Sequence, residues 1–182
     1  IASFVLIAMY KSAKGLEGAF KYLTMSALAT IMILLGLSLI FLKTGTLAYG
    51  ALSANVLAGR EDFRTWLCWG AVVLLISGFA IKTGAVPFHS WLPDAHQSAN
   101  TAVSILLSGI VIKVAGIYGF IVLTNLFRGF SVLNMAIRII GVVSIVVGAL
   151  FALRQTHFKR LVAYSSVSQM GYILLGVSTG TT

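Results

Sequence analysis

Long apolar stretches constrain what this chain can fold into more than any other feature of its sequence. Several of them reach the roughly 20 residues that an α-helix needs to cross about 30 Å of hydrocarbon. The chain is 59% hydrophobic and only 9% charged, with a mean hydropathy of +1.00, which excludes an ordinary soluble domain. The alternating segments of a membrane β-barrel are absent from the sequence. We therefore predict an all-α, polytopic transmembrane helix bundle.

Polar connectors divide the apolar sequence into spans. Complete spans are expected at about residues 17–42, 66–85, 101–127, 132–153 and 161–178. Residues 1–10 (IASFVLIAMY) have the length of half a span. Because the chain starts at Ile1, already in apolar sequence and without a signal-peptide pattern, we interpret residues 1–182 as a single transmembrane domain that is a fragment of a longer protein.

Both prolines of the chain follow the span at 66–85. Pro87 and Pro93 lie within the segment KTGAVPFHSWLPDAHQSAN, residues 82–100. Proline lacks a backbone N–H and its ring clashes with the preceding helical turn. A broken helix is tolerated at membrane depth where it is buried in protein or lines a wet cavity. The sequence thus predicts a break over residues 83–100.

Two lysines lie inside apolar spans, Lys82 near the end of one and Lys113 near the middle of another. A lysine at the midplane costs roughly 2.5 to 3.5 kcal/mol on insertion scales. Burial destabilises the charged form of lysine, so one interpretation is a relay that takes up and releases protons. For Lys82 the alternative is a side chain that extends to the headgroups, whereas Lys113 is too deep for that. Small residues nearby leave room either for water or for close helix packing: Gly78, Gly109 and Gly116.

The predicted break also carries His89, Asp94 and His96. A metal site would need a fourth ligand and a rigid spacing, so no metal is expected here. The two histidines are candidates for proton transfer. For His96 the alternative is an interfacial loop anchored by Trp91.

The last span carries polar side chains at helical spacing: Ser165, Ser168, Gln169 and Tyr172. They predict either interhelical hydrogen bonds or a water-filled path, and Ser165 and Gln169 are the candidates for the path. The span at 132–153 has small residues on one face, which favour helix packing: Gly141, Ser144 and Gly148.

The remaining charges exclude several classes of function. The net charge is +9, but Lys and Arg occur in ones and twos between apolar runs, so no nucleic-acid surface is expected. Glu17 and Lys21, four residues apart, are expected to form a solvated ion pair rather than part of a relay. A single cysteine, Cys68, excludes an internal disulfide and an iron–sulfur site built from cysteines.

Two segments carry a resemblance to a known family. Residues 82–120, KTGAVPFHSWLPDAHQSANTAVSILLSGIVIKVAGIYGF, and residues 157–176, HFKRLVAYSSVSQMGYILLG, resemble signatures of antiporter-like proton-translocating membrane subunits. These subunits occur in respiratory complex I, in membrane-bound hydrogenases and formate hydrogenlyases, and in Mrp-type cation/proton antiporters. The resemblance covers most of residues 17–178 and implies that the chain is a fragment of the larger antiporter-like fold.

The resemblance assigns family roles to particular residues. It implies that Lys82 is the lysine of the broken helix and that Lys113 belongs to the central hydrophilic axis. It also implies a glutamate shortly before Ile1, on the helix that residues 1–10 would end. The sequence departs from the family pattern at Asn100, often a proline, and at Ser108, a histidine in one branch. Redox cofactors of such complexes lie on other subunits, so the resemblance implies no cofactor and no redox catalytic site in this chain.

Three functions follow as hypotheses. The first is a subunit that translocates protons for a complex I-like NADH:quinone oxidoreductase or a membrane-bound hydrogenase. The second is an Mrp-type subunit that exchanges a monovalent cation such as Na⁺ for H⁺ without a redox partner, and the third is a structural scaffold. The first implies other membrane subunits as partners and an energy-transducing membrane, either of a bacterial or archaeal cell or of an organelle. Its candidate relay residues are Lys82, Lys113, His89, His96, Ser165 and Gln169.

Overall fold

The structure is a computed structural model that describes residues 2–8, 13–57, 66–111, 113–127 and 130–179. All regular elements in these ranges are helical. The α-helices are α1 (Ala2–Ala8), α2 (Ala13–Thr44), α3 (Tyr49–Leu57), α4 (Trp66–Thr83), α5 (Trp91–Ser98), α6 (Thr101–Leu106), α7 (Tyr118–Leu126), α8 (Ser131–Leu153) and α9 (Phe158–Thr179). Two π-helical stretches, η2 (Leu107–Val111) and η3 (Lys113–Ile117), separate α6 from α7.

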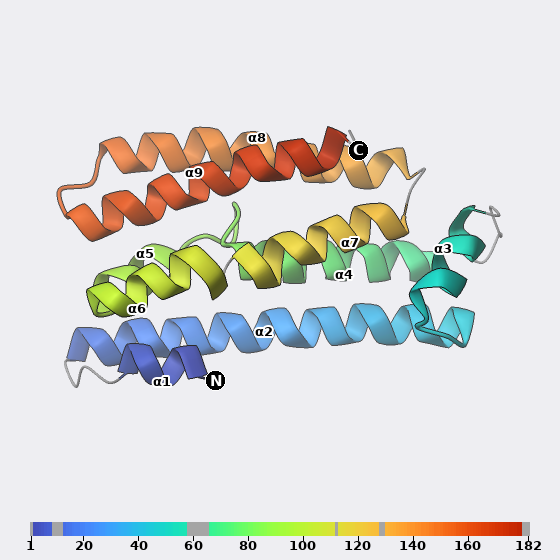
Figure 1. Ribbon diagram of the computed structural model, residues 1–182, viewed down its shortest axis with the longest axis horizontal. Helices are drawn as coiled ribbons and strands as arrows, with labels where there is room; N and C mark the ends of the chain where they lie inside the picture. The colour runs from blue at the N-terminus through green and yellow to red at the C-terminus, as the bar shows by residue number, and fades with distance from the viewer. Residues whose placement is uncertain (1, 9–12, 58–65, 112, 128–129, 180–182) are drawn as a thin grey trace.

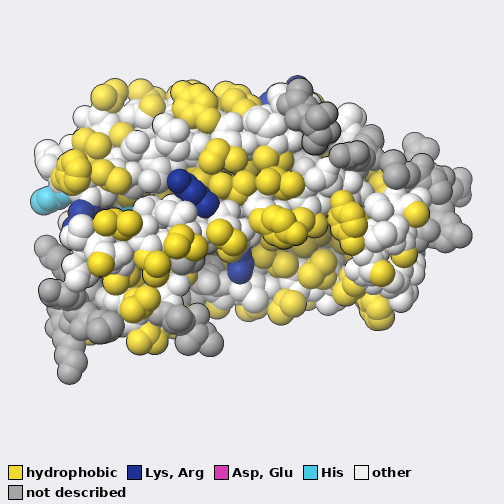
Figure 2. Space-filling model, viewed as in Figure 1, with side chains coloured by type: hydrophobic (Ala, Val, Ile, Leu, Met, Phe, Trp, Pro, Cys, Tyr) yellow, Lys and Arg dark blue, Asp and Glu magenta, His cyan; other side chains and the backbone are white. Residues whose placement is uncertain are grey.

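The predicted all-α membrane fold is confirmed. Five helical segments are long and apolar enough to cross a membrane: Gly15–Thr44, Trp66–Thr83, Thr101–Leu126, Ser131–Leu153 and Phe158–Thr179. They run along the long axis of the bundle, with α8 and α9 at one edge, α2 at the other, and α4 and α7 between them (Figure 1). On the face shown in Figure 2, apolar side chains are spread along the helices with a few Lys or Arg among them, as a lipid-facing surface requires.

Glycines let the long helices approach closely. A Cβ on Gly36 or Gly78 would press into Leu75 of α4 or Ile33 of α2, so these two helices pack with little space between their backbones. On α8, Gly141 and Gly148 meet the backbone of α9 in the same way. The small-residue face expected on residues 132–153 is therefore a packing face.

The broken helix is present, but its geometry differs from the sequence prediction. The α4 helix ends at Thr83, and Gly84 adopts a left-handed conformation with φ +66°. The Gly84 N–H donates to the Ile81 carbonyl at 3.1 Å, and the Ala85 N–H donates to the Ala80 carbonyl at 2.9 Å. This pair of bonds is a Schellman cap. The left-handed conformation of Gly84, and not the prolines alone, therefore ends α4.

The break is also shorter than the expected 83–100. Helix α5 (Trp91–Ser98) forms inside that segment, so the irregular residues are 84–90 and 99–100. Pro93 lies in the first turn of α5, where the missing N–H of proline has no intrahelical acceptor to lose. Only Pro87 lies in the irregular part, and its peptide bond with Val86 is cis.

The span expected at 101–127 has an unexpected interior. It starts and ends as an α-helix, but η2 and η3 occupy its middle, around Lys113. Runs of π-helix are rare, and they often occur at functional sites. A further helix, α3, lies in the stretch expected to be only a connector.

Candidate functional site

Lys82 lies in the last turn of α4, immediately before the break, and its side chain is partly buried. The free carbonyl groups at a helix C-terminus favour a cation at this place. Glu17 and Asp94 are the carboxylates among the described residues, and their ion pairs are formed with Lys21 and Arg160. The part of the chain that the structure describes therefore holds no ion pair for Lys82.

The second lysine-bearing helix touches the end of the first. Gly116 of η3 lies directly against Thr83, whose backbone nitrogen would be 3.0 Å from a Cβ at position 116. Thr83 follows Lys82, and Gly116 is three residues from Lys113. The contact therefore brings together the two helix segments that carry the lysines.

Lys113 itself lies away from this contact. Its side chain is exposed, whereas Gly116 is buried. In an α-helix, residues three apart share a face. The bonds of a π-helix run from i to i+5, and this wider turn places Lys113 away from the face of Gly116.

Both candidate histidines are beside or within α5, outside the five membrane-length helices. His89 is half-buried and its ring stacks on Phe151 at a centroid distance of 6.0 Å, while its Nδ1 is buried without a hydrogen-bond partner. Burial lowers the pKa of His89.

His96 is 2% exposed and lies in helix α5, not in a loop. Its Nδ1 is hydrogen-bonded to the Ser104 hydroxyl, while Nε2 is buried without a partner. Burial, together with the charge of Lys159, lowers the pKa of His96 to about 4. The imidazole is therefore neutral at pH 7.

Trp91 is buried within the bundle as well. It is 4% exposed, its ring lies 5.4 Å from that of Tyr22, and its Nε1 donates to the Ile81 carbonyl at 3.1 Å. Trp91 thus closes the gap between the end of α4 and the beginning of α5.

The polar stripe of the last span divides into two parts. Ser168 is buried and its hydroxyl donates to the Ile145 carbonyl of α8 at 3.3 Å, which is an interhelical hydrogen bond. Ser165, Gln169 and Tyr172 lie on the exposed side of α9. The stripe therefore contributes both to packing and to an open polar surface.

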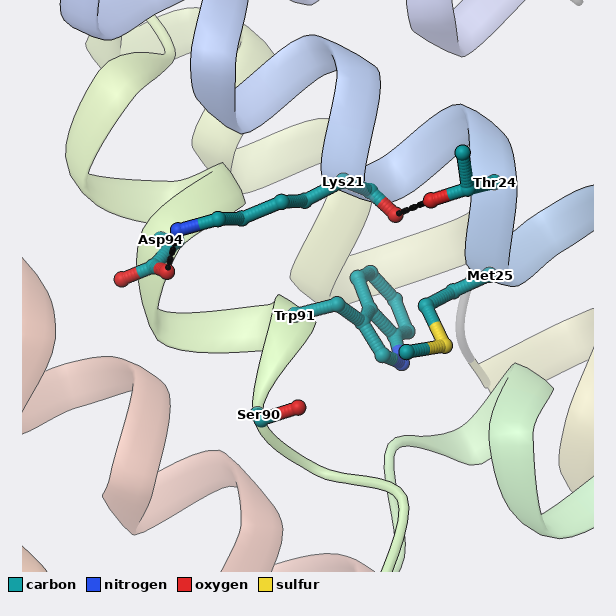
Figure 3. Close-up of a pocket in the computed structure, with 6 residues that line it drawn as sticks. All are labelled: Lys21, Thr24, Met25, Ser90, Trp91 and Asp94. Carbon is teal, nitrogen blue, oxygen red and sulfur yellow. Dashed lines mark hydrogen bonds and ion pairs between the residues drawn. The ribbon is translucent and has the colours of Figure 1, made fainter.

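A charge cluster that the sequence did not reveal joins three helices near α5. The ion pair of Glu17 and Lys21 is present at 2.7 Å, but Lys21 also contacts Asp94 at 2.8 Å, and Arg160 lies 3.5 Å from the other Asp94 oxygen. Lys21 and Asp94 line a pocket of about 320 Å³ together with Thr24, Met25, Ser90 and Trp91 (Figure 3). Sequence reasoning missed this contact because 73 positions separate its two residues.

Metal chemistry finds no support in the described ranges. No group of three or more His, Cys, Asp or Glu side chains there could hold a metal ion. Cys68 is buried in the apolar core.

Solved structures resemble this fold over nearly its whole length. The Mrp complex from Dietzia sp. DQ12-45-1b contains a chain that matches with a TM-score of 0.86 at 29% identity, covering 98% of this chain and 19% of that one. The archaeal membrane-bound sulfane sulfur reductase contains a chain with a TM-score of 0.83, also at 29% identity, covering 97% of this chain and 36% of that one.

Sequence comparison leads to the same group of proteins. NADH-quinone oxidoreductase subunit N of Francisella tularensis subsp. holarctica is 41% identical over 96% of this chain, and that of Cupriavidus taiwanensis is 36% identical over 99%. The chain spans 37% of the length of each of these relatives. The family described as "NADH:quinone oxidoreductase/Mrp antiporter, TM" matches residues 1–182. The chain therefore belongs to the NADH:quinone oxidoreductase/Mrp antiporter family of transmembrane proteins.

Proposed function

We propose that the chain is part of a proton-translocating membrane subunit of a complex I-like NADH:quinone oxidoreductase. The observation that carries the proposal is the contact of Thr83 with Gly116, because it joins the two helix segments that bear Lys82 and Lys113. Both lysines lie in helices of membrane length, where a cation is costly without a function. The relatives named subunit N support the choice of complex.

The proton path in this proposal uses the lysines and the groups of the break. Lys82 and Lys113 take up and release protons, and His89 and His96 connect to them through water. Each histidine has a buried ring nitrogen without a partner, which is a place where a water molecule or a proton is accommodated. Ser165 and Gln169 offer polar side chains on the exposed side of α9 at which the path continues.

The partners follow from this proposal. Electron transfer takes place on other subunits, so this subunit assembles with further membrane subunits in an energy-transducing membrane. Its redox cofactors are carried elsewhere in the complex, and the transported ion is H⁺.

A second candidate is an Mrp-type cation/proton antiporter subunit, favoured by the similarity to a chain of the Dietzia Mrp complex. Its relay would use the same lysines. The two candidates differ in the energy source for proton movement. It is NADH oxidation in the first, and a gradient of Na⁺ or another monovalent cation in the second.

The test uses the full-length protein in its native complex in membrane vesicles. Lys82→Ala and Lys113→Ala are compared with Lys43→Ala, which removes an exposed lysine at the end of α2. We expect NADH-driven acidification of the vesicles to fall severalfold in the first two variants and to stay normal in the third. Equal amounts of assembled complex, measured in parallel, exclude loss of the subunit as the cause.

Normal acidification in both deep-lysine variants would contradict the relay. Proton movement that needs a Na⁺ gradient and no NADH would instead identify the antiporter.

A further inference from the structure

The backbone of the break obtains one of its hydrogen bonds from another helix. The N–H groups of Gly84 and Ala85 bond back into α4, and the Phe88 N–H donates to the Ala85 carbonyl at 2.8 Å. Pro87 has no N–H. The Val86 N–H is different, because it donates to the hydroxyl oxygen of Ser144 on α8 at 3.0 Å.

Ser144 holds a fixed position. It is 0% exposed and lies between Gly141 and Gly148, where α8 meets the α9 backbone at Gly171 and Ser168. A helix pair packed this closely has little freedom to slide, because side chains and backbone interlock. The loop of the break extends toward this helix pair (Figure 1). Ser144 therefore ties the break to a rigid surface.

The Val86 N–H also decides whether α4 continues. In a longer helix it would donate to the carbonyl of Lys82, four residues earlier. Away from water, a backbone donor must find some partner. Because Ser144 accepts the bond from the Val86 N–H, that group is not available to extend α4. The Schellman cap at Gly84 therefore remains the end of the helix.

We propose that Ser144 is a positioning residue for Lys82. By holding Val86 outside the helix, it keeps the end of α4, and with it the Lys82 side chain, at one height in the bundle. Trp91 acts at the other side of the same turn through its bond to the Ile81 carbonyl. This inference rests on the proposed function, in which Lys82 carries protons. It assigns more to Ser144 than the packing role that its small size suggested.

The first test is structural and does not depend on transport. In the full-length protein, Ser144→Ala should make the amides of residues 84–90 exchange about tenfold faster by hydrogen–deuterium exchange mass spectrometry, because Val86 loses its acceptor. The matched control is Ser178→Ala. Ser178 is also buried, 2% exposed, but its hydroxyl bonds to Leu175 within its own helix. Unchanged exchange at 84–90 in Ser144→Ala would overturn the proposal.

The second test separates positioning from general stability. In vesicles with the native complex, we expect Ser144→Ala to lower NADH-driven proton translocation about threefold or more and to alter its pH profile, whereas Ser178→Ala changes neither. Added to Lys82→Ala, Ser144→Ala should cause no further loss, because both act on the same step. Additive losses, or normal translocation by Ser144→Ala, would refute the assignment.

Ser144→Cys covers the case in which the alanine variant does not assemble. It keeps the size of the side chain and replaces the oxygen with a weaker acceptor, so the same changes are expected with smaller amplitude. If Lys82→Ala translocates protons normally while Ser144→Ala still speeds exchange at 84–90, the proposed function fails and the tether remains. If exchange is unchanged, the tether fails whatever Lys82 does.

Discussion

The surroundings of the two lysines are built in different ways. Lys82 ends a helix that is capped by Gly84, closed by Trp91 and tied to α8 through Val86. Lys113 begins η3 and is exposed, although its helix packs against α4 through Gly116. One lysine is thus held by contacts within the described chain, while the other presents its side chain at the surface.

The two lysines both lie in helices of membrane length, but their surroundings differ. An ammonium group in a helix of membrane length needs a polar partner or water. For Lys82 the structure specifies the end of the helix that presents it. For Lys113 it specifies only the π-helical backbone, and we expect groups outside the described residues to cover its side chain. The contacts between the two regions include Thr83 against Gly116 and His96 bonded to Ser104.

The largest effect on stability is expected from low pH, through protonation of His96. The pKa of His96 is about 4 in the folded protein, against roughly 6.5 for an unfolded histidine. Between these values the unfolded chain binds more protons, so the free energy of unfolding falls as the pH drops from about 6.5 toward 4, by on the order of 3 kcal/mol. Above pH 6.5 this group has no effect.

Tm in detergent, measured from pH 7.5 to 4.5, checks this expectation. His96→Gln should flatten the decline, because glutamine does not titrate. His157→Gln, at an exposed histidine just before α9, is the control and should leave the decline unchanged. Parallel curves for His96→Gln and the parent would show that another group causes the loss.

The contact between the two lysine helices should respond to a single methyl group. In Gly116→Ala the new Cβ meets the side chain and backbone of Thr83, and such overpacking costs about 1 to 3 kcal/mol. Gly109→Ala, in the same span, has nothing within 4 Å and is the control. A lower Tm for the first variant only is expected. Equal Tm values would mean that the two lysine regions are not joined through this contact.

A smaller loss of stability is expected at the helix cap that follows Lys82, where a matched glycine serves as the control. Gly84→Ala places a side chain at φ +66° and 3.2 Å from Leu92, with an expected cost of about 1 to 2 kcal/mol. Gly45→Ala has nearly the same φ of +67° but open space around it. The difference between the two losses of Tm therefore isolates the contact with Leu92. A Gly84→Ala protein that is as stable as the Gly45→Ala protein would show that this contact adds nothing.

Hydropathy was sufficient to predict the membrane-length helices, and Pro87 indicated that a helix breaks near it. The sequence shows a glycine at position 84, but not that it adopts the left-handed conformation that forms the cap. The π turns around Lys113 have no signature in hydropathy, so they could not be predicted from the sequence. The bond from Val86 to Ser144 spans 58 positions. Such a contact depends on how the helices pack, which periodicity does not encode.

The smallest effect is expected at the charge cluster that ties α5 to α2 and α9. Asp94→Asn removes the partner that Lys21 and Arg160 share, but Lys21 keeps Glu17 at 2.7 Å. The lysine and both carboxylates are partly exposed, and ion pairs of this kind contribute about 0 to 1 kcal/mol. We expect a Tm loss that shrinks as salt is raised, since salt screens exposed charges. The same loss at low and high salt would show that Asp94 supports α5 by packing rather than by charge.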